Sequence, residues 1–527
     1  MNTPKKHDRT ITVILASFIY CSLFIVFLFN FFGADDYSMQ TAGYGHDYLN
    51  GFDFSLRYGN GRFLGNLFLY YFNYLPIVRI VIKPLVLTIM IICMFYVFEI
   101  KTIWQRIVTA LLVIFPSSGY YASCYAINAC FGNYVLPIAN ISICLALIKA
   151  TGKENRKIHY LLYLLLFALS VCMQLYCENA TIVFLVTAVF LMIYEILVSK
   201  KVSTSKIIFL TGGIIGAVIM YIIPKISDNL IIDSNTMSAY RKIIFNIPFS
   251  LGVVAKFAEC FSTAPICIIL AGLLLIYLVK KESPKDKYKF WHIFISAVYP
   301  AVSLLYLFIQ TGETKVSSDI KLLFLILVCL FLLNAVIIVF RFVKPIKEKT
   351  FLLFMAFILA MSVGMFMFVN LQGYRTFYLS LFIFIGMTLY LAQYILKTYS
   401  IKMDGEQIKR VNCIAVTVMV SFMVLLQLQT IQNYNVFAMR QEYVNLKIAE
   451  GCKEISVLKV PNTNLVRDEW IDFYKSYFTK NGNDVEVVFV DAEEWEWYWK
   501  YRSLLDNPIT SVTYAVEHLE YGNNNGS

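Results

Sequence analysis

Long apolar runs separated by short polar segments form the dominant pattern of the chain. A run of about 20 apolar residues crosses the roughly 30 Å hydrocarbon layer of a bilayer as one helix. Such runs recur at residues 11–32, 77–99, 104–120, 134–150, 158–176, 179–198, 207–224, 251–279, 290–310, 320–340, 350–370, 376–396 and 411–431. The pattern therefore predicts an all-α polytopic membrane protein with about 13 transmembrane helices.

The composition agrees with this pattern and excludes an ordinary soluble domain. Of the 527 residues, 59% are hydrophobic and only 15% are charged, and the mean hydropathy is +0.66. Soluble globular domains carry about 25% charged residues. The first apolar run begins after basic residues, as a signal peptide does, but it is too long and lacks a small-residue cleavage site before Asp35. We expect it to remain as an anchor.

Lysine and arginine gather in alternate loops, which predicts the orientation of the chain. If Lys5, Lys6 and Arg9 lie in the cytoplasm, strict alternation places about 25 basic residues there and about 11 in the outer loops. The basic clusters then assigned to the cytoplasm lie at residues 101–106, 149–157, 200–206, 280–289, 341–349 and 397–410. We therefore expect a cytoplasmic N-terminus, a long first outer loop at 33–76, and everything after 432 outside the membrane.

The charge divides the chain into a basic membrane module, residues 1–432, and an acidic tail, residues 433–527. The tail holds 9 Lys and Arg against 15 Asp and Glu. Short β patterns occur at 455–460 and 484–490, and amphipathic stretches at 435–452, 468–480 and 492–505. These predict a small extracytoplasmic α/β domain. The aromatic run "WEWYWKYR" (495–502) is typical either of one packed helix face or of a platform for sugar or the membrane interface.

Polar and ionisable residues collect in the loops assigned to the outer side. The first loop opens with Asp35 and Asp36 directly after the first span. Further residues of interest are Arg57 and Arg62 in the same loop, Asn133 and Tyr134 between the third and fourth spans, Glu178 and Asn179 between the fifth and sixth, and Arg375 between the eleventh and twelfth. Ionisable groups at a membrane boundary are costly and mark function by default.

These residue types together suit one kind of chemistry. A carboxylate accepts a proton from an acceptor hydroxyl. Arginine holds a phosphate through a planar fork of donors and stays charged. Aromatic and amide side chains suit sugar rings, and apolar grooves between spans suit a lipid chain. The set predicts transfer of a sugar from a lipid-phosphate carrier to an acceptor outside the membrane.

Several short motifs in this order also resemble a known group. They are "ADDY" (34–37), "NGR" (60–62), "FGNYVLP" (131–137), "CEN" (177–179) and "YR" (374–375). Their series, over roughly residues 10–380, resembles the GT-C glycosyltransferase superfamily, and within it the bacterial glucosyltransferases that modify O-antigen and wall polysaccharides. The chain departs from these relatives where they often carry Trp before the Gly-Arg and Asn-Tyr motifs. Tyr58 and Cys130 or Phe131 stand there instead.

The resemblance implies an inverting hexosyltransferase of the bacterial inner membrane. Its donor would be an undecaprenyl-phosphate-linked hexose and its acceptor an extracytoplasmic glycan or wall polymer, with or without help from a divalent metal. Asp35 or Asp36 would be the catalytic base. The other implied roles are donor and phosphate binding for Arg62, Arg375, Asn133 and Tyr134, and contact with acceptor or sugar for Glu178, Asn179 and Arg57.

Each of these residues also has a structural interpretation that the sequence leaves open. The acidic pair suits the N-terminus of a helix, and Arg57 and Arg62 suit the anchoring of an interfacial helix to lipid headgroups. Glu178 suits a pair with a neighbouring helix, and Arg375 suits snorkelling from a span. His46 with Asp47 and Asp53 is a poor metal signature. Twelve scattered cysteines include no C-x-x-C pair, and Cys124 and Cys130 are either buried thiols or a disulfide.

The main competing class is a transporter or flippase for a lipid-linked sugar, and a scaffold that displays the tail is the third. Transporters tend to show internal repeats and charged positions near mid-membrane. We expect the spans to be nearly free of charge, with Lys256 and Glu259 as the exception, paired at i, i+3. This expectation favours the transferase.

Overall fold

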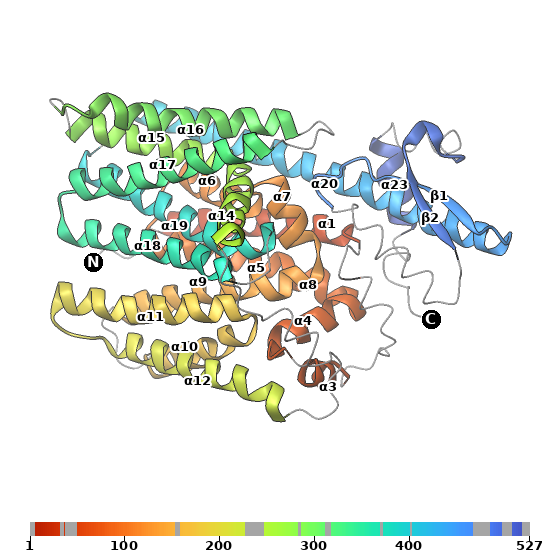
Figure 1. The fold of residues 1–527 in the computed structure, drawn as a ribbon, viewed down its shortest axis with the longest axis horizontal. Coiled ribbons are helices and arrows are strands. Elements are labelled where there is room, and N and C mark those ends of the chain that lie inside the picture. The colour runs from red at the N-terminus through yellow and green to blue at the C-terminus, as the bar shows by residue number, and fades with distance from the viewer. Residues whose placement is uncertain are drawn as a thin grey trace.

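The computed structural model of the chain is a bundle of long helices that run roughly along one axis (Figure 1). It describes residues 6–31, 36, 50–58, 60–152, 159–226, 247–282, 286–310, 318–368, 373–400, 403–466, 485–497 and 508–518. The N-terminus lies at one end of the bundle. Helices α3 (Asn50–Arg57) and α4 (Phe63–Tyr74) lie toward the other end, which we call the α4 end (Figure 1).

Helices long and apolar enough to cross a membrane number eight in the described chain, or ten if two bent pairs each count as one span. The eight are α1 (Lys6–Leu28), α5 (Pro76–Val97), the helix Asn128–Thr151, α11 (Glu178–Ser199), α12 (Thr204–Ile226), α17 (Ser318–Phe342), α19 (Tyr374–Thr398) and α20 (Gly405–Ala449). Three further predicted runs are helical, as α10 (His159–Cys172), α16 (Lys289–Gln310) and α18 (Ile346–Gly364). The prediction of a helical multi-pass membrane protein is confirmed.

Two of the predicted spans are bent pairs of helices. Residues 251–279, expected as a single span, form α14 (Ile247–Ser262) and α15 (Pro265–Glu282), which meet at 88°. Helix α6 (Ile103–Ile114) bends by 57° into residues 118–126, which comprise α7 (Ser118–Tyr120) and η1 (Tyr121–Ala126). The expectation of one continuous helix over 251–279 is therefore wrong.

Proline explains both bends. Pro116 follows α6, and Pro265 is the first residue of α15. The ring of a proline pushes the preceding residue out of the helical region and removes one backbone donor. The two bends also touch, since Ser117 Oγ and Thr263 Oγ1 are 3.1 Å apart. A kink in one span is thus held against the kink in another.

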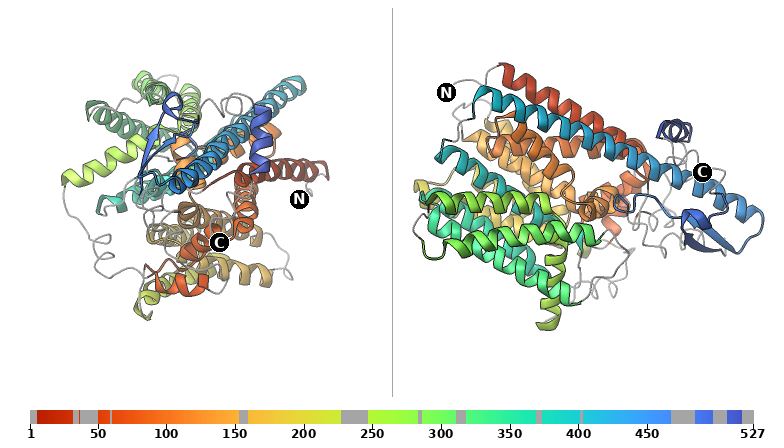
Figure 2. Two further views of the ribbon diagram at one scale, coloured as in Figure 1. Left: turned by 90° about the vertical axis from the view of Figure 1, so that its right-hand side faces the viewer. Right: turned by 90° about the horizontal axis from the view of Figure 1, so that it is seen from above.

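Helix α20 runs through the predicted boundary at residue 432 without a break. Asp404 caps its start by accepting the backbone N–H of Gln407, and the helix then extends for 45 residues. Helix α1 lies along it (Figure 2), with Phe31 stacked on Phe437 at a centroid distance of 4.7 Å. The stretch 435–452, predicted as a separate helix of the tail, therefore continues the last span as far as Ala449.

Two short strands follow α20 at the far end of the molecule (Figure 1). β1 (Glu454–Leu458) and β2 (Glu486–Val490) pair in parallel, with Glu454 opposite Glu486. They agree with the predicted strands at 455–460 and 484–490. The buried Arg440 of α20 joins helix and sheet, because its guanidinium lies 4.8 Å from the ring centroid of Phe489 and its Nε donates to the carbonyl of Leu458.

The rest of the tail is described only in part. The predicted helix at 468–480 lies outside the described residues, and of 492–505 only residues 492–497 are described, beginning with the 3₁₀ turn η5 (Ala492–Glu494). Trp495 is 2% exposed and packs edge-on against Tyr443 at 5.6 Å. Its burial favours the packing interpretation of the aromatic run. Helix α23 (Pro508–Glu517) packs against α20.

The loops predicted to face the cytoplasm meet away from the α4 end. Glu99, just after α5, accepts hydrogen bonds from Lys397 and Lys149 at 2.8 and 2.9 Å. These bonds lower the pKa of Glu99 to about 2. One carboxylate thereby ties together the ends of three helices that are far apart in the sequence.

A glycine lets α15 and α16 approach closely. A Cβ at Gly272 would lie 2.5 Å from the carbonyl oxygen of Ser296 and 2.7 Å from Cγ of Pro300. We expect Gly272→Ala to cost about 1–3 kcal/mol through overpacking. The readout is the thermal midpoint in detergent, followed with a dye that reacts with newly exposed cysteine thiols.

The matched control is Gly252→Ala on α14, where a Cβ meets nothing within 4 Å. Alanine favours a helix by about 1 kcal/mol over glycine, so this variant should be neutral or slightly stabilised. Equal midpoints for the two variants would contradict the close packing at Gly272.

Candidate functional site

The N-terminal ends of four helices meet at the α4 end of the bundle. They belong to α4, to the helix that begins at Asn128, to α11 and to α19. Arg62, directly before α4, contacts Glu178, the first residue of α11. Arg375, the second residue of α19, lies 3.6 Å from Cys130 Sγ. Helix N-termini present N–H groups and the positive end of the helix dipole, so this place favours negative charge.

The Asn-Gly-Arg sequence builds the turn that places Arg62. Gly61 has φ +75°, a conformation that favours glycine. The side-chain oxygen of Asn60 accepts the backbone N–H of Arg62 at 2.9 Å and the amide of Asn66 at 2.8 Å. A short sequence motif therefore fixes the approach of the arginine to its partner.

Arg62 and Glu178 form a tight, half-buried ion pair. The Nε and Nη2 atoms of Arg62 lie 2.8 and 2.7 Å from the same carboxylate oxygen of Glu178, with side chains 21% and 28% exposed. Burial acts to lower the pKa of Arg62, but interactions with Glu178, Tyr134 and Cys177 together raise it. Of the interpretations that the sequence left open for Glu178, the structure contains the inter-helix pair.

Tyr134 lies near both arginines of the site. It is half-buried, and both Arg62 and Arg375 are close enough to interact electrostatically with its hydroxyl. Arg375 is itself half-buried and directs Nη1 at the Cys130 thiol. Four predicted site residues, Arg62, Tyr134, Glu178 and Arg375, thus come together from four separate elements.

Asn133 packs beneath this group through a close contact with Gly65. Its amide nitrogen donates to the carbonyl of Ala129 at 2.9 Å, and its side-chain oxygen is buried without a hydrogen bond within the described part of the chain. A Cβ at Gly65 would lie 2.1 Å from that oxygen. The sequence analysis did not single out Gly65, although it lies close to the Asn-Gly-Arg motif.

The structure describes one carboxylate of the acidic pair, that of Asp36. Asp35 lies outside the described residues. Asp36 is 0% exposed and accepts the backbone N–H groups of Asn128 and Ala129 at 3.0 and 3.1 Å. It therefore caps a helix N-terminus, as the structural interpretation of the pair expected, but the helix belongs to a distant part of the chain.

Two predicted contact residues, Arg57 and Asn179, lie outside the Arg62–Glu178 pair itself. Arg57 pairs with Asp53 on the exposed side of α3 at 2.9 Å, with side chains 39% and 57% exposed. Asn179 is half-buried in the first turn of α11, next to Glu178. His46 and Asp47 lie outside the described residues, and the described residues contain no group of three His, Cys, Asp or Glu side chains able to hold a metal ion.

The sequence analysis missed two buried cations in α5. Arg79 and Lys83 lie in the predicted span 77–99 and are 1% and 0% exposed. The expectation that Lys256 and Glu259 were the exceptional charges within the spans is therefore wrong, although their pairing is confirmed at 3.0 Å. The signal was available, because a charge inside an apolar run marks a functional or paired group.

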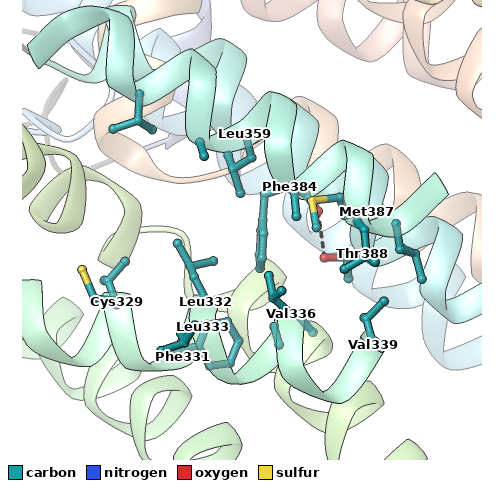
Figure 3. Close-up of a pocket in the computed structure, with 18 of the residues that line it drawn as sticks. Cys329, Phe331, Leu332, Leu333, Val336, Val339, Leu359, Phe384, Met387 and Thr388 are labelled. Carbon is teal, nitrogen blue, oxygen red and sulfur yellow. Dashed lines mark hydrogen bonds between the residues drawn. The ribbon is translucent and has the colours of Figure 1, made fainter. Parts of the chain in front are cut away.

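An apolar groove lies between α15, α17, α18 and α19 (Figure 3). Its volume is about 370 Å³, and Leu359, Phe384 and Val336 extend into it from three helices. The lining residue Leu333 is 58% exposed, so the groove opens on the lipid-facing surface. Phe257 of α14 also lines it and packs against Phe377, two residues beyond Arg375, at 5.4 Å. One lining residue of the groove therefore contacts α19 near Arg375.

Comparison with known proteins adds no relative. No protein-family model matches the chain, and no curated protein matches it.

We expect the Arg62–Glu178 pair to stabilise the fold more than the exposed Arg57–Asp53 pair does. Arg62→Gln removes a half-buried ion pair with Glu178, which should cost about 1–3 kcal/mol. Arg57→Gln breaks an exposed i, i+4 pair, which is worth about 0.3–0.5 kcal/mol. Thermal midpoints in detergent compare the two variants, and a larger loss for Arg57→Gln would refute this order.

Proposed function

We propose that the protein is a membrane glycosyltransferase that moves a hexose from an undecaprenyl-phosphate-linked donor to an extracytoplasmic glycan or wall-polymer acceptor. The observation that carries the proposal is the meeting of four helix N-termini with Arg62 and Arg375 around Tyr134. Such a site suits the phosphodiester of the donor and, after transfer, the phosphate that leaves.

The apolar groove supports a lipid-linked donor rather than a soluble one. Its wall is almost entirely aliphatic and aromatic, and its lining residue Phe257 packs against Phe377, two residues beyond Arg375. An isoprenoid chain in the groove would place its phosphate near the helix N-termini. A nucleotide-linked sugar has no lipid chain and would not need an apolar groove.

The proposed reaction transfers one sugar with inversion at its anomeric carbon. The acceptor hydroxyl oxygen attacks that carbon, the bond from carbon to phosphate oxygen breaks, and the electron pair leaves on the polyprenyl phosphate. The hydroxyl proton passes to a carboxylate. Such a carboxylate is a weak base, so positioning and stabilisation of the leaving phosphate supply much of the rate.

We assign the base to Asp35 rather than Asp36. Both oxygens of Asp36 accept backbone N–H groups within a buried site, and a carboxylate held in this way is a poor and inaccessible proton acceptor. Glu178 is engaged by Arg62. Asn133, Asn179 and Arg57 remain proposed contacts to donor or acceptor.

The proposal includes the placement of the chain in the bacterial inner membrane. We propose thirteen spans, with a cytoplasmic N-terminus and residues 433–527 forming an extracytoplasmic α/β domain. The grouping of the site with the tail toward one end of the bundle, away from the N-terminus, supports this arrangement (Figure 1).

A flippase for a lipid-linked sugar is the competing function, and Arg79 and Lys83 are the observation that favours it. Buried charges in a span are frequent in transport pathways. Here, however, both cations interact electrostatically with Asp36, and Lys83 also donates to backbone carbonyls. These local partners account for the charges without a transport role.

The deciding assay measures the release of radiolabelled sugar from its lipid carrier. Purified protein in detergent is given undecaprenyl-phosphate linked to radiolabelled glucose, N-acetylglucosamine or galactose, with a cell-envelope polysaccharide extract as acceptor. We expect transfer from one donor, lowered about 10²–10⁴-fold by Asp35→Asn and about 10²–10³-fold by Arg375→Ala.

The control is Arg410→Gln, which removes an exposed arginine that pairs with Glu406. It should transfer sugar at the wild-type rate. If no donor loses its label while lipid-linked sugar crosses reconstituted vesicles, the protein is a flippase and the transferase proposal fails.

A further inference from the structure

A backbone break at Ile127 leaves the polar groups of two helix ends inside the bundle. Ile127 is extended (φ −77°, ψ 125°) between η1, which ends at Ala126, and the helix that begins at Asn128. The last carbonyls of the first helix and the first N–H groups of the second have no partner within their own helices. Away from water each unmet group is costly, so other parts of the chain must satisfy them.

Lys83 satisfies the carbonyl side of the break. Its ammonium donates to the carbonyl oxygens of Tyr125 and Ala126 at 3.1 and 3.4 Å, and Asn30 adds a hydrogen bond to Ala126 at 2.8 Å. The C-terminal end of a helix carries negative charge, which a cation stabilises. The ammonium also lies 5.2 to 5.7 Å from the ring centroids of Phe27, Phe72 and Phe131, which offer cation–π contacts.

Asp36 satisfies the N–H side of the same break. Its two oxygens accept the N–H groups of Asn128 and Ala129, where the helix dipole is positive. Arg79 and Lys83, one turn apart on α5, both interact electrostatically with this carboxylate. The acid from the first loop and the lysine from α5 thus hold opposite sides of one break and attract each other.

We propose that Asp36 and Lys83 form a charged clamp on the break at Ile127 and act as positioning residues for the site. The helix that starts at the clamp carries Cys130, which touches Arg375, and Tyr134, which interacts electrostatically with both site arginines. The clamp fixes where this helix begins and therefore where these two side chains lie.

The clamp also ties the first loop to the site helix. Asp36 follows the proposed base Asp35 directly in the sequence, and its own contacts reach the helix that begins at Asn128. This second consequence rests on the proposed function. The clamp itself does not, because its effect on Cys130 can be measured without any donor or acceptor.

The test measures how fast N-ethylmaleimide labels Cys130 in the full-length protein in detergent, resolved by peptide mass spectrometry. The variants are Asp36→Asn, Lys83→Met and the double variant. Cys267, buried on α15 beside Thr388, is the reference within the same molecule. A general loss of stability would speed the labelling of both cysteines, whereas loss of the clamp acts at Cys130.

We expect Cys130 to react at least tenfold faster in all three variants, with Cys267 within twofold of the wild type. The thermal midpoint of the double variant should exceed that of Asp36→Asn alone, because Asp36→Asn leaves both Arg79 and Lys83 buried without the Asp36 charge, whereas the double variant leaves only Arg79 so. If a single variant is not recovered folded, the double variant decides.

Wild-type labelling of Cys130 in the double variant, or a parallel rise at Cys267, would overturn the proposal. The matched control is Lys149→Met, since Lys149 also donates to two helix-end carbonyls, those of Tyr96 and Val97. Its loss should leave Cys130 labelling unchanged. An absence of sugar transfer by the wild-type protein would reject the proposed function and leave the clamp to be decided by the labelling alone.

Discussion

Hydrocarbon offers no hydrogen bonds, and this constraint decides where the chain can interrupt its helices. Each interruption exposes backbone groups that another part of the protein has to satisfy. The bends after Pro116 and before Pro265 meet through Ser117 and Thr263, and the break at Ile127 is filled by Asp36, Lys83 and Asn30. The polar side chains that meet this need are also the ones that frame the candidate site.

The charges of the site are unequal in a way that suits an anionic ligand. Among the described residues, Arg62 pairs with Glu178, Arg79 and Lys83 interact electrostatically with Asp36, and Arg375 contacts the Cys130 thiol. The N-termini of the surrounding helices add partial positive charge. An anion would bring the balance closer to neutrality, and a phosphodiester presents its charge on oxygens that arginine and helix N–H groups both recognise.

The sequence predicted what depends on local pattern and missed what depends on distant contacts. Apolar runs located the helices because burial in lipid follows from composition over about 20 residues. Arg62, Glu178 and Arg375 were found because charge at a membrane boundary is conspicuous. The partner of Asp36 lies 92 residues away in the chain, and no local signal indicates it. The bend in 251–279 was missed although Pro265 marks it, because hydropathy alone was counted.

The continuous α20 has a mechanical consequence for the acidic tail. A helix of 45 residues is about 67 Å long at 1.5 Å per residue, more than twice the roughly 30 Å of hydrocarbon. More than half of it therefore lies beyond the hydrocarbon layer, and α1 packs along part of its length. Arg440 fastens the strands to this helix, so a rigid helix instead of a flexible linker sets their distance from the bilayer.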